Sequence, residues 1–118
     1  MAIMDLLLVG IGGAIGASLR FLVSGLSPEM RGLPTGTLLV NIIGSTVLSL
    51  ITFSTLNPNI HLVNIGILGS FTTFSTFAFE SFRFLGQNNP QEFLANIILN
   101  LTLCITGVTI GHILANLI

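Results

Sequence analysis

Four long apolar segments make up most of the chain, and prolines stand at the breaks between them. The segments cover about residues 2–25, 35–56, 61–86 and 92–118. Each is near or above the ~20 residues that an α-helix needs to cross ~30 Å of hydrocarbon. The breaks, marked by Pro28, Pro34, Pro58 and Pro90, are short, so consecutive helices are expected to run antiparallel. The pattern predicts a single all-α membrane domain over residues 1–118 with four transmembrane helices.

The scarcity of charge excludes the usual soluble classes. Only 6% of the residues are charged and 52% are hydrophobic, whereas soluble domains are about 25% charged. The chain contains no lysine and no basic patch, so no nucleic-acid partner is expected. The sequence also has no embedded pair of histidines or carboxylates and no nucleophile with an evident base, so we do not expect an enzyme.

A run of hydroxyl and phenyl side chains interrupts the third segment. Residues 69–79 read GSFTTFSTFAF. Serine and threonine are poor helix formers whose side chains can bond freed backbone groups, so we expect the third helix to break in its middle, from Gly69 to Thr72. Such a break is tolerated in a membrane only inside protein or beside a cavity, and its freed carbonyls can hold a cation such as Na⁺. The alternative is an unbroken helix whose hydroxyls face neighbouring helices.

Two polar stripes lie on otherwise apolar helices. Thr37, Asn41, Gly44 and Ser45 share one face of the second segment, and Asn96, Asn100 and Cys104 share one face of the fourth. Because lipid cannot satisfy polar groups, both stripes must face protein or water. They could form hydrogen bonds between helices or line a path for an ion.

The polar groups in these stretches are neutral, which favours passage of a small ion. Amide and hydroxyl hydrogens can replace the water around an anion, and the edge of a phenyl ring is positive. A buried Arg or Lys would hold a small anion tightly, whereas a pore needs sites that release it. The alternative is an exchanger of the small multidrug type. That class needs a carboxylate deep in a segment, and Asp5 and Glu80 lie toward the ends of theirs.

Three motifs resemble, in order, those of the Fluc (CrcB) fluoride channels. Residues 12–21, GGAIGASLRF, resemble the opening GGxxGAxxR(Y/F) of that family. Residues 36–44, GTLLVNIIG, resemble its GTLxVNxxG stretch, and residues 69–77, GSFTTFSTF, resemble its GxFTTFSTF signature. The third motif is highly specific, and the resemblance covers essentially the whole chain.

The resemblance implies an antiparallel, dual-topology homodimer in the cell membrane of a microbe, with two fluoride pores at the subunit interface that export cytoplasmic fluoride passively. The residues that it places on or near the ion path are Asn41, Phe74, Phe77, Thr37, Ser75, Thr76, Asn96 and Asn100. It places Arg20 at a vestibule. It also implies a structural Na⁺ at the dimer centre, held by the backbone carbonyls of Gly69 and Thr72 from each subunit.

The fourth segment departs from the family pattern. The family commonly has a tyrosine there, followed by serines at four-residue spacing. Here Asn96, Asn100 and Cys104 align with that track, and the chain has no tyrosine. We therefore expect amides to line the outer end of the pore, where the family commonly has a tyrosine and serines.

The arginines bear on orientation. Arg20, Arg31 and Arg83 all lie toward the side of the loops at 26–34 and 87–91, which the positive-inside rule places in the cytoplasm. Pairing with a sibling subunit of opposite orientation is therefore an alternative to a homodimer. Arg20 could either reach the membrane interface or cap carbonyls inside the protein.

Overall fold

The computed structural model describes residues 2–54 and 64–118 of the chain. Its elements are helical: α1 (Ile3–Leu26), α2 (Thr35–Phe53), the π-helical turn η1 (Asn64–Leu68), the short α4 (Gly69–Phe71), α5 (Phe74–Gly86) and α6 (Pro90–Ala115). The expected end of the second segment at residue 56 and start of the third at residue 61 lie outside the described residues. Helix α6 begins two residues earlier than expected because Pro90 fits the first helical turn, where its missing N–H is not needed.

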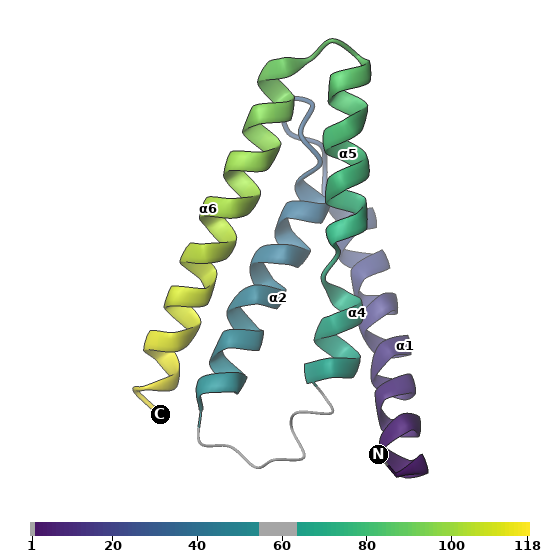
Figure 1. Cartoon of the computed structure of the whole chain (residues 1–118), viewed down its shortest axis with the longest axis vertical. Coiled ribbons are helices and arrows are strands. Elements are labelled where there is room, and N and C mark those ends of the chain that lie inside the picture. The colour runs from purple at the N-terminus through teal and green to yellow at the C-terminus, as the bar shows by residue number, and fades with distance from the viewer. Residues whose placement is uncertain (1, 55–63) are drawn as a thin grey trace.

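The helices form an up-and-down bundle. Both ends of the chain lie at one end of the molecule, and the connections α1–α2 and α5–α6 lie at the other (Figure 1). By length and composition, α1, α2 and α6 can each cross a membrane. The segments η1, α4 and α5, which follow α2 in the sequence and precede α6, together run along the bundle. The chain is therefore a multi-pass membrane protein by architecture.

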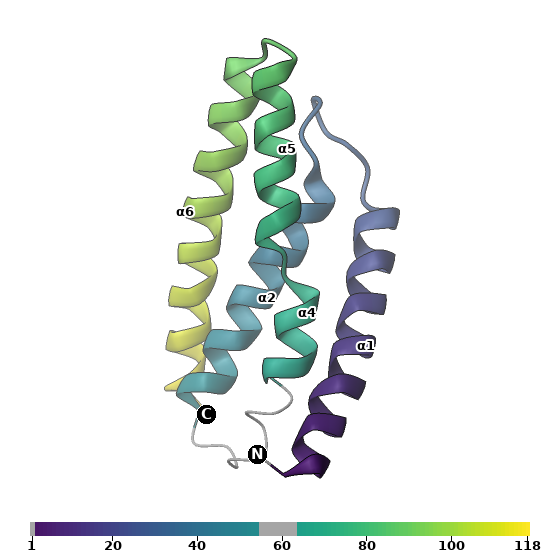
Figure 2. The same cartoon turned by 45° about the vertical axis from the view of Figure 1, so that its right-hand side comes forward.

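Helix α2 lies at the centre of the bundle and packs along α6. The two halves of the third span diverge from one another: η1 and α4 contact α1, whereas α5 contacts α6 (Figure 2). The break in the third span therefore lies against α2, where Asn41 bonds Thr73, and faces α1, where Arg20 bonds the Thr72 carbonyl.

Glycines allow the closest helix contacts. A Cβ added to Gly16 on α1 would overlap the Ile67 carbonyl oxygen and the Ser70 hydroxyl. A Cβ added to Gly111 on α6 would meet the backbone of α2 at Thr46. In lipid, where no hydrophobic effect drives helices together, such close backbone approach supplies the packing energy.

The break expected in the third span is present, and the alternative of an unbroken helix is wrong. It lies slightly later than expected, because Gly69–Phe71 is still helical and the extended residues are Thr72 (φ −79°, ψ 160°) and Thr73 (φ −150°, ψ 119°). Helix α5 starts immediately after them, at Phe74.

Candidate functional site

Thr73 caps the helix that follows the break. Its hydroxyl oxygen accepts a hydrogen bond from the backbone N–H of Thr76 at 3.2 Å, which is the usual role of a threonine at the N-cap. The same hydroxyl donates to Thr76 Oγ1 at 2.9 Å and lies 3.3 Å from Ser75 Oγ. In a continuous helix the Thr76 N–H would have bonded the Thr72 carbonyl, so the cap frees that carbonyl.

Asn41 of α2 pairs with both backbone groups of Thr73. Its Oδ1 accepts from the Thr73 N–H at 2.8 Å, and its Nδ2 donates to the Thr73 carbonyl at 3.0 Å. The Thr73 N–H would otherwise have bonded the Gly69 carbonyl one helical turn earlier. Asn41 therefore satisfies the backbone at the break and frees a second carbonyl.

A chain of buried amides continues from Asn41 across to α5. Asn41 Nδ2 also lies 3.4 Å from Asn100 Oδ1, and Asn100 Nδ2 donates to the backbone carbonyl and Oδ1 of Asn96 at 2.9 and 3.2 Å. Asn96 Nδ2 donates to Ser81 Oγ at 2.9 Å, and Ser81 donates to the Phe77 carbonyl at 2.8 Å. These hydrogen bonds join α2, α6 and α5; Asn96, Asn100 and Ser81 are almost fully buried, and Asn41 is half-buried.

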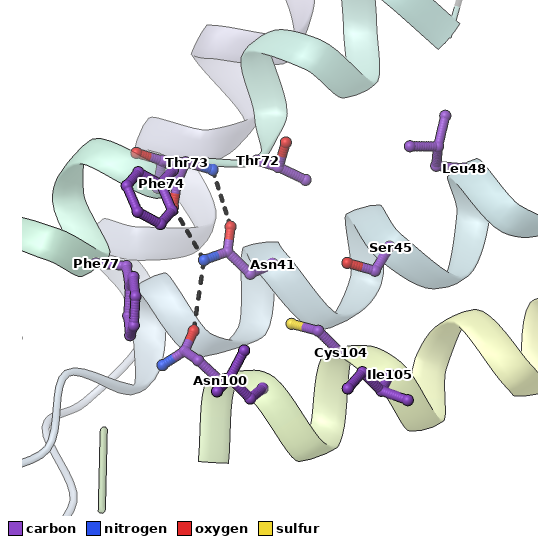
Figure 3. A pocket seen from close by; sticks show the side chains of 11 residues that line it. Asn41, Ser45, Leu48, Thr72, Thr73, Phe74, Phe77, Asn100, Cys104 and Ile105 are labelled. Carbon is purple, nitrogen blue, oxygen red and sulfur yellow. Dashed lines mark hydrogen bonds between the residues drawn. The ribbon is translucent and has the colours of Figure 1, made fainter. Parts of the chain in front are cut away.

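A cavity of about 350 Å³ lies beside this chain. It is lined by Asn41, Ser45, Leu48, Thr72, Thr73, Phe74, Phe77, Asn100, Leu101, Cys104 and Ile105, most of which Figure 3 labels. The rings of Phe74 and Phe77 are tilted by 57° with centroids 5.8 Å apart. The cavity therefore combines two amides at its wall with two phenyl rings and aliphatic side chains.

A second cavity, of about 540 Å³, lies on the α1 side of the break. Arg20, Thr37 and Thr76 line it, and so does Thr73, which lines the first cavity too. Arg20 Nη1 donates to the freed Thr72 carbonyl at 3.3 Å. Of the two alternatives for Arg20, the structure therefore has the side chain capping a carbonyl inside the protein and not extending to the membrane interface. Thr73 thus lines both cavities.

Glu80 is tied to α2 by Thr37. Thr37 is 4% exposed, and its hydroxyl donates to Glu80 Oε1 at 2.7 Å. Glu80 Oε2 is buried and has no hydrogen-bond partner among the residues that the structure describes. At the other end of the molecule, Asp5 accepts a hydrogen bond from the Ala2 N–H at 3.0 Å, so that carboxylate caps the start of α1.

The structure brings most of the expected ion-path residues together around the break. Asn41, Phe74, Phe77 and Asn100 line the first cavity, and Thr37 and Thr76 line the second. Ser75 is exposed beside them, whereas Asn96 is buried behind Asn100 and lines neither cavity.

Sequence reasoning did not single out Thr73 or Ser81. Thr73 could have been found from the sequence, because threonine is a preferred N-cap residue and Thr73 directly precedes the first residue of α5. Ser81 lies on α5 among phenylalanines, and only its contact with Asn96 reveals its part in the amide chain.

The freed carbonyls of Gly69 and Thr72 fit the donor set that a hard cation such as Na⁺ prefers, namely neutral carbonyl oxygens at an unwound helix. Gly69 is exposed on the single chain, with open space around its α-carbon. Gly69 and Thr72 contribute one carbonyl oxygen each. The Arg20 contact uses one acceptor position of the Thr72 oxygen and leaves the other.

Comparison with known proteins decides the family. The family model described as CrcB-like protein, Camphor Resistance (CrcB), matches residues 7–112. The chain belongs to the CrcB family. A relative from Methanosarcina acetivorans, named fluoride-specific ion channel FluC 3, is 51% identical over 90% of this chain and 96% of its own length. FluC 1 of Methanosarcina barkeri is 50% identical over 95% and 97%, and FluC of Methanocaldococcus jannaschii is 41% identical over 96% and 95%.

These names bear on two of the expectations. They describe ion channels and not enzymes, so the chain is not an enzyme. Together with the three helices long and apolar enough to span, they identify this CrcB protein as a multi-pass membrane protein.

Proposed function

We propose that the protein is a fluoride-selective ion channel of the cell membrane that lets cytoplasmic fluoride leave down its gradient. The observation that carries this proposal is the cavity in which the Asn41 amide lies beside the Phe74 and Phe77 rings. An N–H donor and positive ring edges attract a small anion without a fixed cation that would retain it. The names of the relatives supply the ion.

The ion path that we propose runs through both cavities and past Thr73, which lines each of them. Arg20 and Thr37 lie in the second cavity, which would serve as the vestibule that gathers anions. Phe74, Phe77 and Asn41 lie in the first, where the anion would exchange water for ring edges and an amide.

We further propose that two copies of the chain assemble in antiparallel orientation with a pore on each side of their interface. Phe74 leaves 77% of its surface uncovered in the single chain, and the hydroxyls of Ser75 and Thr76 are exposed beside it at membrane depth. The Thr73 hydroxyl contacts both of them, at 3.3 and 2.9 Å, and lipid could not satisfy their remaining hydrogen-bonding capacity. A second copy would cover them and add its own wall to the path.

At the centre of such a dimer, the carbonyls of Gly69 and Thr72 from both copies would hold a Na⁺ ion. The ion would be structural: it would be coordinated by the oxygens that the break frees and would hold the breaks of the two copies together. Asn41 and Thr73 keep those oxygens free by satisfying the neighbouring N–H groups within the chain.

The deciding experiment is fluoride efflux from liposomes that contain the purified protein, followed with a fluoride electrode. With a K⁺ ionophore present to compensate charge, we expect rapid fluoride efflux and very slow chloride efflux from matched vesicles. Efflux that proceeds equally well without the ionophore would show that bare fluoride is not the conducted species.

A further inference from the structure

The buried amide chain fixes which end of each amide faces its neighbour. The Thr73 N–H can only donate, so Asn41 must turn Oδ1 toward it, which leaves Nδ2 facing Asn100. The Asn96 backbone carbonyl can only accept, so Asn100 must turn Nδ2 toward it, which leaves Oδ1 facing Asn41. Asn100 is 6% exposed and Asn96 is 3% exposed, so an amide turned the other way would leave buried groups unsatisfied.

Asn100 therefore presents an acceptor to Asn41 and not the donor that an anion would seek. The Asn41–Asn100 contact, at 3.4 Å, is also the longest hydrogen bond in this chain of amides, whereas the two Asn41–Thr73 bonds measure 2.8 and 3.0 Å. N–H···O bonds usually lie between about 2.7 and 3.2 Å. The second Asn41 N–H is therefore held weakly, at the wall of the cavity that contains Phe77 (Figure 3).

We propose that Asn100 Oδ1 is a built-in competitor for the anion at Asn41 and so sets how readily that position releases fluoride. The inference rests on the proposed function. An arriving anion takes the second Asn41 N–H from Asn100, and when the anion leaves, Asn100 takes it back. An N–H that loses its acceptor in a half-buried site is costly, so the competitor lowers the cost of emptying the position and speeds release. Asn100 acts through Asn41 and is a positioning residue.

The test is an Asn100→Thr variant, for which α6 itself supplies the precedent. Thr102, Thr106 and Thr109 each donate to the carbonyl four residues earlier, at 2.7, 2.7 and 3.0 Å. A threonine at 100 can bond the Asn96 carbonyl in the same way, and it is too short to reach Asn41. The change therefore removes the competitor and keeps the Asn96 carbonyl satisfied.

Fluoride currents are measured in planar bilayers as a function of fluoride concentration. We expect the half-saturating concentration to fall about fivefold in Asn100→Thr, equivalent to about 1 kcal/mol, and the maximal current to fall with it. Asn100→Leu, which has the branched shape of asparagine but a larger volume, should shift in the same direction and serves if the threonine variant does not assemble. Thr102→Val, an exposed position on the same helix, should match the wild-type chain.

The outcomes separate cleanly. A half-saturating concentration that stays constant or rises in the Asn100 variants would overturn the competitor role. A lower maximal current at constant half-saturation would do so too, since it would indicate a packing role alone. A wild-type chain without fluoride current would instead refute the proposed function.

Discussion

The Asn41 side chain forms two hydrogen bonds with the backbone of Thr73, 32 residues later in the chain, through the N–H and the carbonyl of that one residue. Asn41 thus gives the Thr73 backbone one acceptor and one donor, as a neighbouring strand would in a β-sheet. It explains how two consecutive residues can leave the helical conformation within a membrane span, where unpaired backbone groups cannot find water.

The first prediction concerns this pairing. In Asn41→Asp, one oxygen can still accept from the Thr73 N–H, but the other faces the Thr73 carbonyl and Asn100 Oδ1 as a third acceptor. We expect a loss of about 1–3 kcal/mol of unfolding free energy for the unsatisfied groups, together with loss of fluoride flux. Thermal unfolding in detergent checks the stability. Asn116→Asp, the same chemical change at an exposed position, should stay within about 0.5 kcal/mol of wild type.

The second prediction tests the phenyl rings. Phe77→Ile keeps an apolar side chain in the cavity but removes one of the two phenyl rings that line it together with Asn41. We expect fluoride efflux to fall at least tenfold, which corresponds to a loss of about 1.4 kcal/mol of stabilisation of the anion by the ring. Size-exclusion chromatography should still show the assembled protein. Phe82→Ile, on the same helix and 73% exposed, should conduct normally. Normal flux in Phe77→Ile would remove the ring-edge argument.

Much of the fold could be predicted because it depends on local composition. Apolar length and proline positions indicate the spans, and the hydroxyl run indicates the break near Thr72. The position of the break within one or two residues depends on more distant groups, since Thr73 leaves the helix where Asn41 can reach it. No spacing rule links residues 32 positions apart on different helices.

The site was predictable by residue type but not by orientation. The sequence shows that Asn100 shares a helical face with Asn96, and an amide offers both a donor and an acceptor. Which of the two faces the cavity is decided by the Asn96 carbonyl and by Asn41. The contact of Arg20 with the Thr72 carbonyl likewise depends on how far α4 lies from α1.

The third prediction tests the contact between α1 and the first half of the third span. An alanine at Gly16 would push its Cβ into the Ile67 carbonyl oxygen, which is backbone and cannot move aside cheaply. We expect Gly16→Ala to destabilise the protein by about 1–3 kcal/mol, as overpacking usually does. Gly10→Ala on the same helix meets open space within the chain and should be neutral or slightly stabilising. Equal effects of the two changes would contradict the close packing.

The fourth prediction concerns Thr37 and Glu80. Thr37→Val keeps the shape of the side chain and removes the hydroxyl that donates to Glu80 Oε1. Glu80 Oε2 already lacks a partner within the described chain, so the change would also remove the 2.7 Å hydrogen bond of Oε1. We expect the unfolding free energy of the protein to fall by about 1–3 kcal/mol. Thr37→Ser should restore most of it. Thr109→Val, whose hydroxyl bonds only its own helix, serves as the control.

The fifth prediction separates sodium from the conducted ion. If the Gly69 and Thr72 carbonyls of two copies hold Na⁺, the ion binds the assembled dimer and not the separated chains, so it stabilises the dimer by mass action. We expect the thermal midpoint and the dimer fraction on dilution in detergent to rise with Na⁺ concentration at constant ionic strength. N-methylglucamine, too large to fit between carbonyls, should not replace it. A dimer whose stability is the same in both cations would rule out the sodium site and leave the fluoride path, which uses Asn41 and the phenyl rings, unaffected.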